Sequence, residues 1–237
     1  MNSPTFSIKN YEMRIKHLCS RKLEYLRALN GEKFDLNKLL DFTTRLFELY
    51  DKWQIAMLKN REEPIACGSG CGSCCYHFPQ SVEPFEALFL YVRLRQNPDM
   101  VNFIARCWDR VTYFGRMWKE NVPKNPDEGD SLLQRYFMKQ QPCPFLNKDQ
   151  SCGVYKYRPM ICRMYFSDSD PVYCGPKHLL SDENRAFHLC LPDHIELDLA
   201  EISQLLDLEL STSFYESILD LNALEGEGYF DAVEHIQ

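Results

Sequence analysis

The sequence predicts a mostly α-helical protein in which helices flank a core built from loops. Two observations lead to this prediction. Apolar residues recur at helical spacing over residues 8–29, 35–59 and 197–221, as expected for helices that bury one face. Between them, most of the eleven cysteines lie in two stretches rich in Gly, Ser and Pro. Because these stretches have little apolar bulk, something other than hydrophobic packing must order them.

Start and stop signals give the order of the elements. Helices are expected over residues 8–29, 35–59, 84–96, 97–119, 131–139 and 197–221, with a loop over 122–130 and a break near Ser211. The first two form an antiparallel pair, since only a short segment after Asn30-Gly31 separates them. Pro84 suits the first turn of the third helix, and Asn97 suits the N-cap of the fourth.

The first cysteine stretch reads Cys67-Gly-Ser-Gly-Cys71-Gly-Ser-Cys74-Cys75. Thiolates are soft ligands that suit zinc and iron–sulfur centres, and Cys-x-x-Cys spacing lets two sulfurs reach one ion from a tight turn. Cys74 and Cys75 are adjacent, so along an extended backbone their side chains project in different directions. This stretch therefore predicts a metal core, with an indication of more than one metal ion.

The second stretch carries Cys143-Pro-Phe-Leu and then Cys152-Gly-Val-Tyr-x-x-Arg158-Pro159-x-x-Cys162-Arg163. Together with the first, it resembles the YkgJ-like cysteine-cluster proteins, also called the CxxCxxCC family, over residues 67–165. One departure is the first gap, which is three residues here, between Cys67 and Cys71. The resemblance implies chelation of zinc or of an iron–sulfur centre, without specifying a reaction.

Seven thiols carry the motifs of this resemblance, which implies that they are metal ligands: Cys67, Cys71, Cys74, Cys75, Cys143, Cys152 and Cys162. Seven ligands do not fill two tetrahedral sites, so Cys174 and Cys190, both in irregular segments, are further candidates. Nine thiolates suit three zinc ions with bridging sulfurs, whereas four suit one [4Fe–4S] cluster. Cys107 lies on an apolar helical stripe and is expected in the hydrophobic core, and Cys19 is grouped with it.

Two arginines and one histidine lie beside these cysteines. Arg158 and Arg163 flank Cys162 and are candidate positive partners of an anionic metal site, although a salt bridge to a carboxylate elsewhere is an equal alternative. His77 follows Cys75 closely and is a possible zinc ligand, but the motif does not require it, so we expect it either on the surface or beside the ligands without ligating. The other histidines show no metal-binding spacing.

Charge is unevenly distributed around the net value of −7. Residues 1–61 hold twelve Lys and Arg against seven Asp and Glu, while residues 193–237 hold twelve Asp and Glu and no Lys or Arg. We expect the two ends either to pack together or simply to form solvated faces; the alternative is that the acidic end meets a basic protein partner. No basic face with interleaved aromatics favours nucleic-acid binding.

The expected cellular compartment is inferred from two kinds of segment that the sequence does not show. No apolar run is long enough to span a membrane, and residues 1–18 have no apolar stretch of the secretory kind. An odd number of cysteines without an export signal is typical of a reducing compartment, so we expect a cytoplasmic protein. We expect one compact unit of three regions: a helical pair over 1–62, a cysteine-cluster region over 63–192, and an acidic helical segment over 193–237.

The sequence thus predicts a metalloprotein that binds an iron–sulfur centre or zinc through two cysteine-rich loops. Iron–sulfur is the first hypothesis, with a role in electron transfer, redox sensing or cluster-dependent catalysis. No catalytic residue can be named. The alternative, from a different functional class, is a structural zinc protein that presents a partner-binding surface without catalysis.

Overall fold

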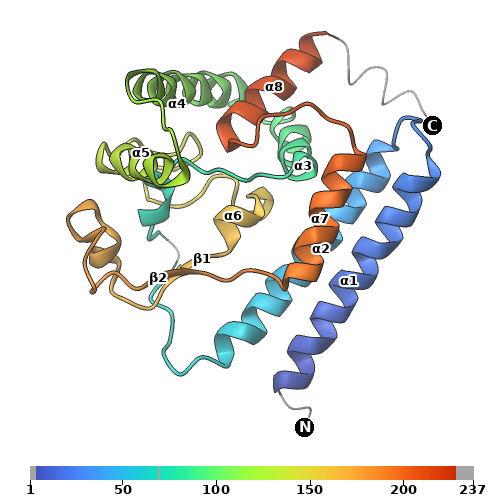
Figure 1. Cartoon of the computed structure of the whole chain (residues 1–237), viewed down its shortest axis with the longest axis horizontal. Helices are drawn as coiled ribbons and strands as arrows, with labels where there is room; N and C mark the ends of the chain where they lie inside the picture. The colour runs from blue at the N-terminus through green and yellow to red at the C-terminus, as the bar shows by residue number, and fades with distance from the viewer. Residues whose placement is uncertain (1–3, 69, 228–237) are drawn as a thin grey trace.

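The computed structural model describes residues 4–68 and 70–227. Its α-helices are α1 (Pro4–Ala28), α2 (Leu36–Lys59), α3 (Pro84–Leu94), α4 (Met100–Glu120), α5 (Pro126–Met138), α6 (Met160–Arg163), α7 (Asp193–Leu205) and α8 (Phe214–Gly226). Two short strands, β1 (Tyr165–Ser167) and β2 (Ala186–His188), pair antiparallel. The prediction of a mostly α-helical protein with its cysteines in loops is confirmed. Figure 1 shows α1, α2 and α7 on the right, and the loops with β1 and β2 on the left, below α4 and α5.

The helices α1 and α2 form the predicted antiparallel pair (Figure 1). α1 ends before Asn30 and Gly31, which take positive φ values of 49° and 87°, a conformation that suits these two residue types. Asp35 then caps α2, because its side chain accepts a hydrogen bond from the Lys38 N–H at 3.1 Å. The turn and the cap that define this pair are therefore local, and they involve no residue of the cysteine region.

The acidic helix α7 packs along the basic helix α1, as Figure 1 shows. Lys16 Nζ lies 2.7 Å from a carboxylate oxygen of Asp198, and Arg27 pairs with Glu201 one helical turn further along α7. Both pairs are partly solvated, so each contributes little energy and mainly fixes which faces meet. Of the two outcomes expected for the two ends, packing together is the one that α1 and α7 show within the described residues.

Helix α3 lies inside the molecule and connects the helical pair to the rest. Eight of its eleven residues, all between Phe85 and Leu94, are at least 97% buried, so it contacts neighbours all around. Phe42 of α2 meets Phe85 edge to face at 5.7 Å, and α8 packs on α3 and α4 from the other side. Because α3 follows the first cysteine stretch in the chain, its packing fixes the position of the chain shortly after that stretch.

Four predicted helix starts were misplaced, and of these α1 and α7 begin four residues earlier than predicted, at Pro4 and Asp193. α4 begins at Met100, because the Asn97 side chain turns the chain by accepting from the Asp99 N–H at 2.9 Å before the helix starts. α5 begins at Pro126 instead of residue 131, because Asn125 caps it by accepting from the Glu128 N–H at 2.9 Å. The predicted loop over 122–130 is therefore only the short segment before Pro126.

The hairpin of β1 and β2 was not predicted. Tyr165 pairs with His188 and Ser167 with Ala186, and residues 168–185 form the connecting loop. Three residues are too few for an alternating pattern to stand out in sequence. The hairpin matters for the site, because it begins two residues after α6 and its loop carries Cys174.

The two cysteines that were predicted to be in the hydrophobic core are there. Cys19 and Cys107 have no exposed surface and belong to the main apolar cluster.

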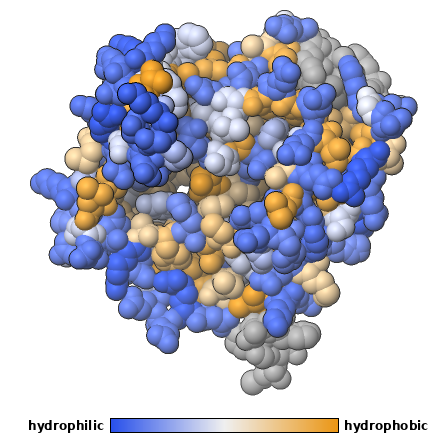
Figure 2. Space-filling view, in the orientation of Figure 1, coloured by the Kyte–Doolittle hydropathy of each residue, from blue (hydrophilic) through white to orange (hydrophobic). Residues whose placement is uncertain are grey.

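Among the described residues, no helix is long and apolar enough to cross a membrane. The face in Figure 2 is mostly hydrophilic, with apolar residues gathered near the middle of the view.

Candidate metal centre

The two cysteine stretches pack directly against each other, as the sequence predicts. The Cys143 N–H donates to the Cys75 carbonyl at 2.7 Å, which joins the second stretch to the first. Gly72, with φ of 60°, leaves no room for a side chain, since an added Cβ would lie 2.7 Å from Gln150 Oε1. The Tyr76 hydroxyl contacts the same Gln150 oxygen at 3.3 Å. Glycine at this position therefore permits the close approach of the two loops.

A cavity of about 350 Å³ lies where the loops meet, and thiols from both stretches line it. These cysteines are Cys74, Cys75, Cys143, Cys152 and Cys162. Cys74 and Cys75 come from a single 3₁₀ turn, Ser73–Tyr76, while Cys162 comes from the one-turn helix α6. Cys152 is held by a bridge to Leu146. Five thiols from four local structures thus face one enclosed space.

The wall beside the thiols is formed by aromatic and imidazole rings. His77 stacks on Phe137 at a centroid distance of 4.2 Å and lies 5.5 Å from the ring of Tyr165, whose cross-strand partner is His188. His77, Tyr165 and His188 all line the cavity. Burial lowers the pKa of His77 to about 4 and also lowers that of His188, so both rings are neutral at pH 7. His77 lies at the cavity wall, which is one of the two positions expected from the sequence. His188 was not predicted at the site, because only its pairing with Tyr165 in the hairpin brings it there.

Burial also sets the protonation of the thiols. It raises the pKa of Cys143 to about 12 and that of Cys162 well above its ordinary value. Cys74 is the exception: a hydrogen bond from the Cys75 thiol, helped by the nearby Arg158 guanidinium, lowers its pKa to about 7. The buried thiols are therefore protonated in the metal-free protein, and a bound metal must displace those protons.

The two arginines beside Cys162 have different surroundings. Arg158 lines the cavity, stacks on the Tyr155 ring at 3.9 Å, and its buried Nε has no hydrogen-bond partner within the described residues. Arg163 is 2% exposed and pairs with Asp51 of α2 at 2.8 Å, and its guanidinium also donates to the carbonyls of Lys156 and Arg158. Arg158 is thus placed beside the thiols, while Arg163 makes the salt bridge considered as its alternative.

A buried glutamate that the sequence analysis did not single out holds Cys162 in place. Glu86 is 1% exposed, and its two carboxylate oxygens accept from the N–H of Met160 at 2.7 Å and of Glu83 at 3.1 Å. One side chain therefore caps α3 and α6 together. Burial raises the pKa of Glu86 to about 7. The local sequence signal was the capping box of Glu83 and Glu86 at the start of α3.

The remaining candidate cysteines lie outside the cavity lining. Cys67 is beside Ser167 at the end of β1, with its Sγ accepting from the Ser167 N–H at 3.2 Å. Cys71 contacts the Ser73 hydroxyl at 3.6 Å, and Cys174 is in the hairpin loop. Cys190 is exposed and lines a different hollow, together with Glu86 and Glu196. The structure thus separates Cys190 from the other eight candidates.

The donor set fits zinc or an iron–sulfur centre. Thiols from both stretches share one cavity, and soft thiolates are the ligands these centres prefer. Over residues 4–68 and 70–227, no three side chains of His, Cys, Asp or Glu already stand in the arrangement of a finished metal site. Metal binding is coupled to folding in such loops, so the sulfurs must move together when the metal enters.

A comparison with family models matches residues 66–175 to CxxCxxCC, described as "Putative zinc- or iron-chelating domain". The matched range contains the two cysteine stretches, the cavity thiols and Cys174. Searches of the curated proteins and of the solved structures gave no match. The part of the chain that is similar to the CxxCxxCC domain is therefore residues 66–175, and this similarity supports metal binding by the cysteine region.

Proposed function

We propose that the cavity between the two cysteine stretches binds an iron–sulfur cluster, which makes the protein redox-active. The observation that carries this proposal is a cavity of about 350 Å³ lined by five thiols. A single zinc ion held by four sulfurs at about 2.3 Å fills only the space between those sulfurs. A cavity of this size accommodates a larger inorganic group.

Cys75, Cys143, Cys152 and Cys162 are the proposed ligands of the cluster. Cys143 and Cys152 are among the neighbours that raise the pKa of both Cys75 and Cys162, so the four thiols lie near one another. Arg158 supports the assignment because its charge favours an anionic cluster and its unpartnered Nε lies beside the thiols. A bound cluster would exchange electrons with a partner or a substrate, and the half-buried rings of His77 and Tyr165 line the cavity beside it.

Iron analysis tests this proposal. Protein purified without oxygen should be brown and contain about four iron atoms and as many acid-labile sulfides per chain. The variant Cys162→Ser should lose most of the iron, because a buried cluster ligand is removed. Cys190→Ser is the matched control, since Cys190 is outside the cavity lining, and it should keep the wild-type iron content. Colourless, iron-free wild-type protein, or equal iron in both variants, would contradict the proposal.

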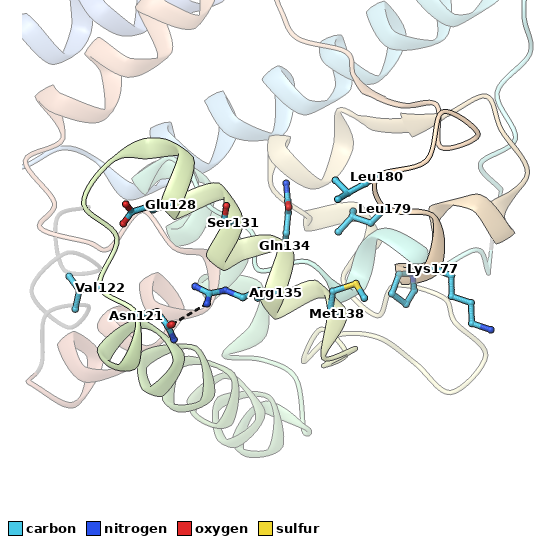
Figure 3. Close-up of a pocket in the computed structure, with 11 residues that line it drawn as sticks. Asn121, Val122, Glu128, Ser131, Gln134, Arg135, Met138, Lys177, Leu179 and Leu180 are labelled. Carbon is cyan, nitrogen blue, oxygen red and sulfur yellow. Dashed lines mark hydrogen bonds between the residues drawn. The ribbon is translucent and has the colours of Figure 1, made fainter.

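A second candidate function is a structural zinc protein that presents a surface to a partner. It is favoured by a wide groove of about 750 Å³ between α5 and residues 176–180, away from the cysteines. Figure 3 shows Met138, Leu179 and Leu180 at this groove, and Arg135 bonded to Asn121 at 3.0 Å. Leu180 is 84% exposed and lies with Met138 and Leu179 in the lining, so the groove offers apolar contacts to a partner. Colourless protein that releases zinc to a thiol reagent would favour this candidate.

A further inference from the structure

Helix α8 lies outside the matched range, yet it closes one side of the thiol cavity. Its residues Phe214 and Tyr215 line the cavity, although the match to the CxxCxxCC domain ends at residue 175. Two backbone hydrogen bonds fix the start of this helix. The Phe214 N–H donates to the Pro79 carbonyl at 3.1 Å. The Val82 N–H donates to the Thr212 carbonyl at 3.0 Å. The position of Tyr215 is therefore set by the segment that follows the first cysteine stretch.

The Tyr215 hydroxyl is buried and has two acceptors within reach. The residue is 1% exposed, and its ring meets Phe78 edge to face at 5.2 Å. The hydroxyl lies 3.4 Å from the carbonyl oxygen of His77, which is long for an O–H···O hydrogen bond. It also forms a hydrogen bond with the thiol of Cys143. Because a phenol has one proton to donate, the carbonyl and the sulfur compete for it.

When Cys143 ligates a metal, Tyr215 is the donor of this hydrogen bond. A metal-bound cysteine has lost its proton, so its sulfur can only accept. The thiolate carries negative charge, and hydrogen bonds to charged acceptors are stronger than those to neutral ones. Metal binding therefore favours the sulfur over the His77 carbonyl as the acceptor of the Tyr215 proton.

We propose that Tyr215 is a positioning residue of the metal centre, whose hydroxyl donates to the Cys143 thiolate and stabilises the reduced, more negatively charged state of the bound cluster. This inference rests on the proposed iron–sulfur cluster and adds to it a residue from outside the matched range. Hydrogen bonds to the ligand sulfurs are among the features that set the reduction potential of a cluster. An O–H donor withdraws electron density from the sulfur, so the bond raises that potential.

A second buried tyrosine provides the matched control. Tyr136 also meets Phe78 edge to face at 5.2 Å and is fully buried, but it does not line the cavity. Among the described residues, its hydroxyl has no hydrogen-bond partner. Tyr215→Phe and Tyr136→Phe therefore remove the same atom from similar aromatic surroundings, and only Tyr215→Phe removes a hydrogen bond to a proposed ligand.

Redox titration of the iron-loaded protein, followed by visible absorbance, tests the inference. Tyr215→Phe should keep the wild-type iron content, because its ring and all the thiols remain in place. Its reduction potential should shift to a more negative value, because the reduced state loses a hydrogen bond. Tyr136→Phe should keep the wild-type potential. An unchanged potential in Tyr215→Phe, or the same shift in both variants, would overturn the inference.

A second measurement separates this inference from the identity of the metal. Zinc in the cavity instead of iron would contradict the cluster, but the Cys143 thiolate would still accept from Tyr215. Because this bond makes the sulfur less nucleophilic, a thiol reagent should release zinc roughly tenfold faster from Tyr215→Phe than from wild type or Tyr136→Phe. Equal release rates from the three zinc-loaded proteins would overturn the role of Tyr215 independently of the cluster.

Discussion

Removing the metal should unfold the cysteine region while leaving the long helices in place. The cysteine segments around the cavity consist of turns, 3₁₀ turns, the bridge between Leu146 and Cys152 and the one-turn helix α6, so their hydrogen bonds are local and no long helix orders them. Metal ligation in comparable small sites contributes on the order of 10 kcal/mol of apparent folding free energy. We expect the metal-free form to lose cooperative unfolding of this region and to melt at a much lower temperature.

Circular dichroism on protein treated with a chelator and a reductant measures this effect. The helices α1, α2 and α7 pack through their own apolar faces and ion pairs, so most far-ultraviolet signal should persist. The near-ultraviolet signal should collapse, because Tyr165 and His77 lose their fixed surroundings. Restoring the metal should restore the signal. Identical melting curves with and without metal would show that ligation does not stabilise these loops.

Replacing Arg163 should give the second largest effect. The variant Arg163→Ala removes donors to three acceptors, Asp51 and the carbonyls of Lys156 and Arg158, and also a guanidinium 4.1 Å above the Phe47 ring. Loss of these bonds and of buried packing should lower the free energy of unfolding by about 3 kcal/mol. Chemical denaturation of the metal-loaded protein measures it.

Asp51→Ala provides the matched control for the ion pair. The Asp51 side chain is 48% exposed, and Arg163 would keep its two carbonyl acceptors in this variant. Asp51→Ala should therefore lower the free energy of unfolding clearly less than Arg163→Ala does. Equal losses in the two variants would mean that the ion pair alone, and not the anchoring of the loop carbonyls, accounts for the role of Arg163.

Much of the helical framework could be predicted because its signals are local. The turn at Asn30 and Gly31, the start at Pro84 and the break near Ser211 each depend on a few neighbouring residues. The start of α5 was misplaced because Pro126 was taken as a loop residue, although proline also suits the first helical turn. The three-residue strands were missed because their pairing depends on contacts across residues 168–185.

The candidate site was predictable in its donors but not in their grouping. Spacing and the flanking Gly and Pro identified the thiols, since such neighbours are unusual for buried free cysteines. Which thiols line the cavity, and why Cys190 lies in a different hollow, depends on contacts between segments far apart in the chain. Glu86 shows the same limit: its capping role is local, but its bond to Met160 joins residues far apart in sequence.

Native mass spectrometry of protein purified without oxygen tests the central claim most directly, namely that thiols from both cysteine stretches hold one inorganic group. The wild-type chain should carry the added mass of an iron–sulfur cluster. Cys75→Ser in the first stretch and Cys143→Ser in the second should each lose that same mass. A wild-type chain at its bare polypeptide mass, or a cluster retained in either variant, would contradict the account.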